Sequence, residues 1–294
     1  MDEFNVQRTK INKSVRMENK NIVLFGGNSF VGSAIEKRLD NCGMSVSTFS
    51  RNDADFTDLD QVKRMVNDVE EGGVLVLVAA KSPAKNFGDI EENIRLISNL
   101  CVVLTSKNPN YVLNISSDAV YADSVQALTE KSLQAPLNPH GVMHSMREMI
   151  VNNTFNCTVG HLRPTLIFGD GDPHNGYGPN RFKRNMAVGD PITLFGQGEE
   201  RRDHIHIDDV ALIAGEMIMA RQKGPVNAVT GKVRSFMEIA EAACFSDDQV
   251  QNIVTTRRQG TMPHNGYRAF DNMLAKKLCS NAEFRDVLDY LKNK

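Results

Sequence analysis

The chain has 294 residues, of which 41% are hydrophobic and 24% are charged, and its formal net charge is −2 at pH 7. These values are typical of a globular protein, and the near-neutral charge without a basic cluster argues against a nucleic-acid-binding surface. The longest apolar run, residues 74–80, is too short to span a bilayer, and the N-terminus has no apolar signal region. The five cysteines form no Cys-x-x-Cys pair, which favours reduced thiols and a cytoplasmic location.

The first ordered pattern is an apolar run that meets a glycine turn. Residues 22–25 are all apolar and run directly into Gly26, and a helical apolar pattern begins at Phe30. This succession predicts a buried strand, a tight turn and a helix. Because the first amides of a helix lack backbone partners and the dipole favours an anion there, such a turn suits a pyrophosphate. The spacing Gly26-x-x-Ser29-x-x-Gly32 departs from the dinucleotide fingerprint at Ser29, so a plain strand–turn–helix stays open on this stretch alone.

Strand and helix patterns alternate from here to about residue 165. We predict strands at 44–49, 74–80, 111–115 and 158–162, a helix capped by Asp58, and helices at 90–105 and 140–151. Strands that alternate with helices indicate a Rossmann-type α/β fold, with a doubly wound parallel sheet and right-handed crossovers.

The pattern changes after Pro164. A turn-rich loop spans 169–180, and shorter elements follow: helices at 181–188, 208–221, 236–244 and 274–291, and strands at 192–195 and 204–207. We expect a flexible N-terminal extension over 1–19, a dinucleotide-binding domain over 20–165 to which 203–230 returns, and a smaller substrate-binding lobe over 166–294. The functional site is expected in the cleft between sheet and lobe.

The end of the second predicted strand bears on the cofactor. In a dinucleotide fold, a carboxylate there binds the 2′-hydroxyl of the adenosine ribose, whereas an arginine pairs with a 2′-phosphate. Here the strand ends in Phe49-Ser50-Arg51 without a carboxylate, which favours NADP over NAD; the alternative is that Arg51 is a solvated turn residue. Asp55 and Phe56 are expected at the adenine pocket, although an aspartate before a helix is commonly only a cap.

Seven short motifs follow one another in an order shared with a known family. They are Gly26-x-x-Ser29-x-x-Gly32, Ala79-Ala80, Glu92-Asn93-Ile-Arg-Leu-Ile-Ser-Asn99, Ile115-Ser-Ser-Asp-Ala-Val-Tyr121, Pro136-Leu-Asn-Pro139, Leu162-Arg-Pro164 and Arg202-Asp-His-Ile-His-Ile-Asp-Asp-Val210. With them the chain resembles the extended short-chain dehydrogenases/reductases of the NAD(P)-dependent epimerase/dehydratase type, which act on nucleotide sugars. The resemblance implies a homodimer and cofactor contacts from Gly26, Ser29, Phe30, Val31, Gly32, Ala79, Ala80, Asn93 and Pro164.

One matching segment implies a catalytic serine. By the resemblance, Ser117 hydrogen-bonds the substrate oxygen that becomes a carbonyl; a serine that only caps a turn is the alternative. Asp118 stands where 4,6-dehydratases of the family carry an acid and is expected to contact the substrate. The glutamate that those enzymes need next to it is Ala119 here, which disfavours a dehydratase.

The family's Tyr-x-x-x-Lys motif is replaced by His140-x-x-x-His144. A phenol with a pKa of about 10 needs the lysine to exchange protons near neutrality, whereas imidazole titrates at about 6.5 without help. We expect His140 to exchange the substrate's proton and His144 to hold the cofactor ribose. Imidazole has a shorter reach than phenol, so a bridging water or another acid (Tyr121 or Tyr177) stays open, as does a loss of redox catalysis.

The histidines and two arginines raise the questions of a metal site and of phosphate binding. Two histidines four residues apart on a helix also fit zinc, but no third ligand is fixed by spacing, so we expect no metal. His204 and His206 alternate along a predicted strand and are expected to be ordinary hydrogen-bonded histidines. By the resemblance, Arg202 contacts the substrate pyrophosphate; Arg258 resembles a second phosphate contact, with a surface role as the alternative.

These observations lead to one functional interpretation. Tyr177 and Asn180 of the 169–180 loop are expected to contact the sugar, unless this is a plain mobile loop. The sequence then predicts an enzyme that uses NADP(H), or else NAD(H), to epimerise or reduce a nucleotide sugar, with neither nucleic acid nor membrane as a partner. The alternative is a non-catalytic NADP-binding sensor on the same fold.

Overall fold

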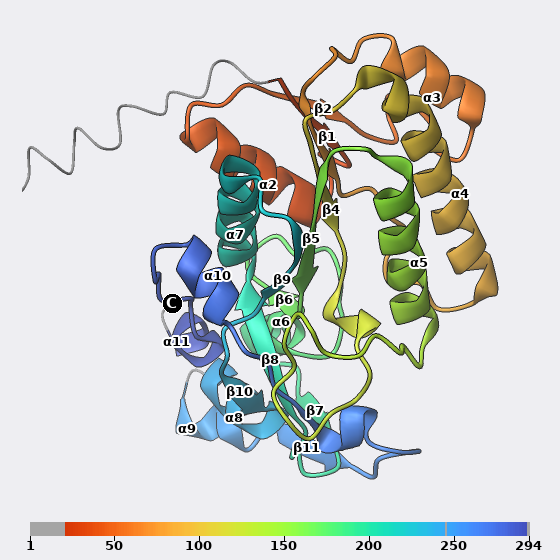
Figure 1. Ribbon diagram of the computed structural model, residues 1–294. Helices are drawn as coiled ribbons and strands as arrows, with labels where there is room; N and C mark the ends of the chain where they lie inside the picture. Colours follow the sequence, from red (N-terminus) through yellow and green to blue (C-terminus); the bar gives the residue numbers. More distant parts are fainter. Residues whose placement is uncertain (1–20, 245, 293–294) are drawn as a thin grey trace, which may run out of the picture.

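The computed structural model describes residues 21–244 and 246–292, so the predicted extension over 1–19 lies outside the described residues. A six-stranded sheet with the order β2-β1-β3-β4-β5-β9 forms the upper part of the molecule (Figure 1). Every neighbouring pair in it is parallel. The strands are β1 (Ile22–Phe25), β2 (Val46–Phe49), β3 (Val74–Leu77), β4 (Tyr111–Ile115), β5 (Thr158–Pro164) and β9 (Gly224–Ala228). This confirms the Rossmann-type α/β fold.

Helices cover both faces of the sheet (Figure 1). One layer contains α2 (Phe30–Asn41) and α7 (Ile207–Ala220), and the other contains α3 (Leu59–Val66), α4 (Phe87–Leu104) and α5 (Pro139–Thr154). Ile22 and Leu24 of β1 belong to the core under the first layer, whereas Val23 and Phe25 belong to the core under the second. Side chains on both faces of each strand are thus buried, which explains the continuous apolar runs in the sequence.

Side-chain caps set the starts of the helices that flank the site. Ser29 caps α2, because its Oγ accepts a hydrogen bond from the Gly32 amide at 3.0 Å. Asp58 caps α3 as predicted, and Asn138 caps α5 by accepting from the Gly141 amide. Asn86 caps α4, so this helix begins at Phe87, three residues earlier than the periodicity indicated. It continues into the 3₁₀ helix η1 (Thr105–Lys107).

The smaller lobe is built around β8 (Arg201–His206), which pairs with β6 (Leu166–Phe168), β10 (Val233–Ser235) and β12 (Tyr267–Arg268). A separate ribbon joins β7 (Ile192–Phe195) to β11 (Ile253–Thr256). The other elements are η2 (Asp118–Val120), α6 (Pro179–Val188), α8 (Phe236–Ala243), α9 (Asp247–Val250), η3 (Pro263–Gly266), α10 (Met273–Leu278) and α11 (Val287–Lys292). Phe168, Phe182 and Phe236 lie in the core of this lobe, at the bottom of Figure 1.

Other predicted boundaries also differ from the structure. The strand at 74–80 ends at Leu77, because the amides of Val78 and Ala79 both bond to the Phe25 carbonyl and leave the regular ladder. The strand at 44–49 begins only at Val46. The helix predicted over 274–291 is two helices, α10 and α11, because Ser280 and Asn281 adopt the left-handed conformation and end the first one.

Two features bear on the class of protein. Among the described residues, no helix is long and apolar enough to cross a membrane. The five cysteines all lie within these residues, and none of them forms a disulfide there.

Candidate functional site

A cleft of about 1060 Å³ opens beyond the carboxyl ends of β1, β3 and β4, on the side of the smaller lobe. It brings together most of the residues singled out in the sequence: Gly26, Ser29, Phe30, Val31, Arg51, Phe56, Ala79, Ala80, Ser117, Asp118, His140, His144, Pro164, Tyr177, Asn180 and Arg202. The predicted residues that do not line it are Gly32, Asp55, Asn93 and Arg258.

The glycine turn at one end of the cleft is closely packed. Gly26 has φ +105°, and a Cβ there would lie 2.7 Å from the Ala79 amide nitrogen. A Cβ on Gly32 would lie 2.1 Å from the Gly26 carbonyl oxygen, so Gly32 lets α2 pack against the turn. Ser29, the unexpected residue, donates to the same carbonyl at 2.7 Å while capping α2. The open cradle at the amino end of α2 fits a dinucleotide pyrophosphate.

Asp55 and Asn93 have local structural roles. The Asp55 carboxylate accepts hydrogen bonds from the amide and hydroxyl of Thr57, at 2.9 and 2.7 Å, and so shapes the turn before α3. Asn93 accepts from the Lys81 amide at 2.8 Å and donates to its carbonyl at 3.0 Å. It therefore fixes the loop that carries Ala79 and Ala80 along the cleft wall.

The end of β2 presents no carboxylate to the cleft. Ser50, Arg51 and Asn52 line the cleft here. The nearby Asp53 carboxylate accepts hydrogen bonds from the amide and hydroxyl of Ser50, at 2.7 and 2.9 Å, and does not line the cleft. The exposed Arg51 is the charged side chain of this wall.

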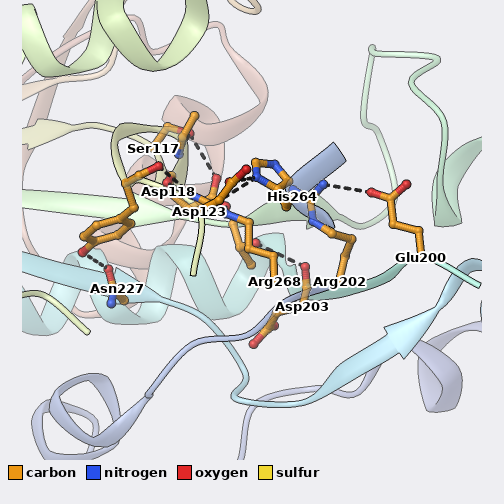
Figure 2. A network of polar contacts seen from close by, with 12 residues as sticks. Ser117, Asp118, Asp123, Glu200, Arg202, Asp203, Asn227, His264 and Arg268 are labelled. Atoms are coloured by element: carbon orange, nitrogen blue, oxygen red, sulfur yellow. Dashed lines mark hydrogen bonds and ion pairs between the residues drawn. The ribbon is translucent and has the colours of Figure 1, made fainter. Parts of the chain in front are cut away.

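Ser117 is held by a buried ion pair (Figure 2). It caps η2, and its hydroxyl accepts from the Ala119 amide at 3.2 Å and lies 3.4 Å from Asp118 Oδ1. The other oxygen of Asp118 accepts from Arg268 Nε at 3.1 Å, and Arg268 Nη2 donates to the Asp118 carbonyl at 2.6 Å. Because Arg268 holds both the side chain and the backbone carbonyl of Asp118, this ion pair fixes the segment that carries Ser117.

The two histidines of α5 lie against each other at the cleft. Their ring centroids are 4.6 Å apart with perpendicular planes, and the Nδ1 atom of each is buried without a hydrogen-bond partner in the described part of the chain. Burial lowers the pKa of His140, although Asp118 opposes the shift. Burial, followed by the charges of His140 and Arg147, holds the pKa of His144 well below its usual range. Both rings are therefore neutral near pH 7.

A close helix contact aligns His140 with Ser117. Gly141 packs so tightly on η2 that a Cβ there would lie 2.1 Å from the Ala119 carbonyl oxygen and 2.6 Å from Pro136 Cβ. Only glycine permits this approach. It brings the amino end of α5 and the Ser117 segment to the same wall of the cleft.

The alternative tyrosines have different positions. Tyr121 is buried outside the cleft, where its hydroxyl donates to Asn227 Oδ1 at 2.6 Å and accepts from Arg163 Nη1 at 2.8 Å. Burial raises the pKa of Tyr121 to about 12, so Tyr121 is excluded as the acid. Tyr177 does line the cleft, and its hydroxyl accepts from the Phe195 amide at 3.3 Å.

The 169–180 loop is tied down at Asn180. Its Oδ1 accepts from the Gly169 amide at 3.1 Å, and its Nδ2 donates to Asp172 Oδ2 at 2.7 Å. Asn180 therefore has one hydrogen bond at each end of its amide, and it sets the path of the loop along the cleft. Tyr177 packs against Phe236 with ring centroids 4.5 Å apart.

A buried glutamate connects the two predicted phosphate ligands. Glu200 Oε1 lies 3.3 Å from Arg202 Nη1, and its Oε2 lies 3.4 Å from Arg258 Nη2. Arg258 also donates to the Phe195 carbonyl and lines a second cavity of about 640 Å³. Arg202 and Tyr177 line both cavities, so the second one adjoins the cleft.

The prediction for His204 was wrong, whereas that for His206 is confirmed. His206 Nδ1 accepts from the Asp208 amide at 3.2 Å and caps α7. His204 is buried and lines the cleft, but neither of its ring nitrogens has a hydrogen-bond partner among the described residues. The alternation of residues along a strand predicts the face of the sheet on which the His204 side chain lies. It does not predict whether a hydrogen-bond partner lies on that side.

Three residues that sequence reasoning missed take part in the contacts described above or line the cleft. They are Glu200, Arg268 and His264, and the last lines the cleft with its Nδ1 2.5 Å from Asp123 Oδ1 (Figure 2). Arg268 would have stood out if it interrupted a recognisable apolar strand. The residues around it show no such pattern, so no signal in the sequence indicated that its side chain is buried. Among residues 21–244 and 246–292, no group of three or more histidine, cysteine, aspartate or glutamate side chains is arranged to hold a metal ion.

Comparisons with known proteins agree with this geometry. The model of the NAD dependent epimerase/dehydratase family matches residues 22–229. The ADP-L-glycero-D-manno-heptose-6-epimerase of Brachyspira hyodysenteriae is 24% identical over 254 residues, which cover 75% of this chain and 79% of that protein.

Solved structures show the same fold. The UDP-glucose 4-epimerase of Thermus thermophilus, in complex with NAD, has a TM-score of 0.80 at 18% identity and covers 92% of this chain and 96% of its own. The UDP-N-acetylglucosamine 4-epimerase of Bacillus cereus has a TM-score of 0.76 at 21% identity, with 93% and 94% covered. At such identities the likeness establishes the architecture.

Proposed function

Because the chain belongs to the NAD dependent epimerase/dehydratase family, we propose that it oxidises and reduces a hydroxyl or keto carbon of a nucleotide sugar, as an epimerase or ketoreductase. The observation that carries this proposal is the composition of one cleft. It is lined by the glycine turn, Ser117, His140 and Arg202 together. A dinucleotide seat, a hydrogen-bond donor, a proton carrier and a phosphate ligand are what such a reaction requires.

The dinucleotide is held at the glycine turn. Ser29, Phe30 and Val31 begin α2 beside the cradle, and Ala79 and Ala80 form the opposite wall. When bound, the nicotinamide dinucleotide supplies or accepts the hydride. The Nδ1 atom of His144 is buried and has no partner within residues 21–244 and 246–292, which supports a hydrogen bond to a ribose hydroxyl in place of the family's lysine.

The protein's own groups handle the proton. The Ser117 hydroxyl polarises the reacting oxygen of the sugar. The neutral ring of His140 accepts the proton of a hydroxyl that is being oxidised, and the imidazolium returns it in the reverse direction. No lysine is needed, because a nearby ammonium would only disfavour the charged form of His140.

We propose NADP as the preferred cofactor. Arg51 lines the cleft at the end of β2, whereas the Asp53 carboxylate accepts a hydrogen bond from the Ser50 amide within the same turn and does not line the cleft. A guanidinium without a competing carboxylate suits a 2′-phosphate. Arg51→Ala should weaken NADP⁺ binding about 10-fold and leave NAD⁺ binding unchanged. Equal affinities of the wild type for both cofactors would contradict the preference.

We also propose a homodimer in the cytoplasm. The paired helices α4 and α5 expose Val102 and Met149, which are 65% and 64% accessible, next to Met146. A second copy would cover this apolar face. Sedimentation should give twice the monomer mass, and Met149→Glu should reduce it. The absence of any disulfide among the five cysteines, all of which lie in the described part of the chain, favours a reducing compartment.

The activity is tested with purified protein, NADPH or NADH, and a panel of nucleotide sugars and their 4-keto derivatives. Loss of the reduced cofactor's absorbance reports reduction, and chromatography of the nucleotide sugars reports epimerisation. Turnover of at least one nucleotide sugar supports the proposal. Tight cofactor binding without turnover of any member would instead support a non-catalytic, cofactor-binding protein.

A further inference from the structure

The ring of His204 is buried at the cleft, where no described residue hydrogen-bonds to it. The residue is 2% exposed, and both Nδ1 and Nε2 are unpaired among the described residues. Burial, followed by the charge of Arg202, lowers the pKa of His204 to about 3, although the nearby Arg202 backbone favours the charged ring. The ring is therefore neutral, with one N–H donor and one lone pair. Leaving both unsatisfied in the interior costs free energy, which indicates a partner other than the described residues, such as a ligand in the cleft.

The surroundings of this ring favour an anion. Arg202 precedes His204 by two residues on β8, so both side chains leave the same face of the strand, and Arg202 Nε is also buried without a partner among the described residues. On the other side stands Gly178, where a Cβ would lie 4.0 Å from His204 Nε2. Gly178 is the N-cap of the ten-residue helix α6 and makes no side-chain cap. The amino end of α6, which is the positive end of its dipole, thus lies next to the imidazole.

His204 also stands where the cleft meets the second cavity. The ring of Phe236, which lines the second cavity, meets the His204 ring edge to face with centroids 5.7 Å apart. Arg202 lines both cavities. A nucleotide sugar whose sugar reaches His140 and whose nucleoside fills the second cavity must carry its diphosphate across this junction.

We propose that His204 binds the substrate by donating a hydrogen bond to a phosphate oxygen of its diphosphate, beside Arg202 and the amino end of α6. The proposal rests on the proposed function and adds a residue to the substrate site. The phosphate accepts from the ring N–H, and a hydroxyl of the adjoining ribose donates to the other nitrogen. Both unpaired atoms are then satisfied only in the complex.

The test is equilibrium binding of nucleoside diphosphates to the cofactor-saturated protein. UDP, ADP, GDP, CDP and dTDP are titrated calorimetrically into the wild type and into His204→Phe, which keeps a planar ring and removes both nitrogens. We expect the tightest diphosphate to bind at least about 10-fold more weakly to the variant. Cofactor affinity should be unchanged. The melting temperature of the ligand-free variant should be equal or higher, because a buried unpaired polar group has been removed.

A neighbouring histidine provides the control. His206→Phe changes the next histidine on the same strand, whose nitrogen is paired within the protein. It should lower the melting temperature while diphosphate affinity stays within about twofold. Equal diphosphate affinity of His204→Phe and wild type, or no nucleoside diphosphate binding by the wild type, overturns the proposal. Turnover of a nucleotide sugar by the wild type is measured separately, so the proposed function can stand when this inference fails.

Discussion

The two halves of α5 bury polar side chains in opposite ways. In the carboxyl-terminal half, Arg147 donates to Asn114 Oδ1 at 2.7 Å and to two backbone carbonyls at the end of β3 and just after it. Glu148 pairs with Arg163 through hydrogen bonds of 2.6 and 2.8 Å. In the amino-terminal half, the Nδ1 atoms of His140 and His144 are buried with no partner among the described residues.

The difference suggests that the carboxyl-terminal half of α5 has a structural role and that its amino-terminal half belongs to the proposed site. Buried polar groups are nearly always paired, so the paired half holds α5 against the sheet. The unpaired half faces the cleft, where the proposed cofactor and substrate would supply the missing hydrogen bonds. The helix end that carries histidines in place of the family's tyrosine and lysine thus differs from a purely structural helix end, in which buried polar groups are paired.

The largest effect is expected for His140→Phe. Removing His140, the proposed proton carrier, should lower kcat by about 10²- to 10⁴-fold. Cofactor affinity and the free energy of unfolding should stay at the wild-type level, because the lost Nδ1 has no partner among the described residues. Steady-state kinetics, cofactor titration and denaturant unfolding measure the three quantities. Wild-type activity in this variant would remove His140 from the mechanism.

Glu148→Gln, in the carboxyl-terminal half of α5, should affect stability, which His140→Phe leaves unchanged. The variant leaves the buried Arg163 charge uncompensated, which should lower the free energy of unfolding by about 3 kcal/mol or more. Glu91→Gln on the exposed face of α4, where the carboxylate pairs with Arg95, is the control and should change it by less than about 0.5 kcal/mol. Similar losses in both variants would show that the buried pair has no special structural role.

Gly141→Ala tests the contact that joins the two catalytic segments. The added methyl group collides with the Ala119 carbonyl, so we expect a loss of about 1–3 kcal/mol in stability and a lower kcat as His140 moves away from Ser117. Gly88→Ala, where the nearest atom to the new Cβ is a side-chain oxygen at 3.3 Å, is the matched control. Unchanged kcat in Gly141→Ala would mean that this spacing is not needed.

The smallest effect concerns pH. Oxidation requires neutral His140, and its pKa lies below the ordinary value of about 6.5 because of burial. The value of kcat/KM for oxidation should therefore remain full at neutral pH and fall only as the pH drops through a midpoint below about 6.5. A profile of kcat/KM against pH measures the midpoint. A midpoint above neutrality would indicate a different base.

The sequence predicts features whose cause is local. Residues 22–39 fold as strand, turn and helix because the apolar period and the glycine turn both lie within that segment. Ser29 and Asp58 cap the helices that follow them for the same reason. The break between α10 and α11 was missed, because Ser280 and Asn281 are not residues whose type alone imposes a left-handed backbone.

What the sequence by itself determined is the order of strands and helices, the glycine turn and the exchange of Tyr-x-x-x-Lys for two histidines. Only the tertiary structure decided which polar groups of the described residues are paired: Arg268 with Asp118, Glu200 with two arginines, and His204 with no partner. The physical reason is separation along the chain. Arg268 and Asp118 lie 150 residues apart, and no periodic pattern specifies which distant side chain will fill a buried hydrogen bond.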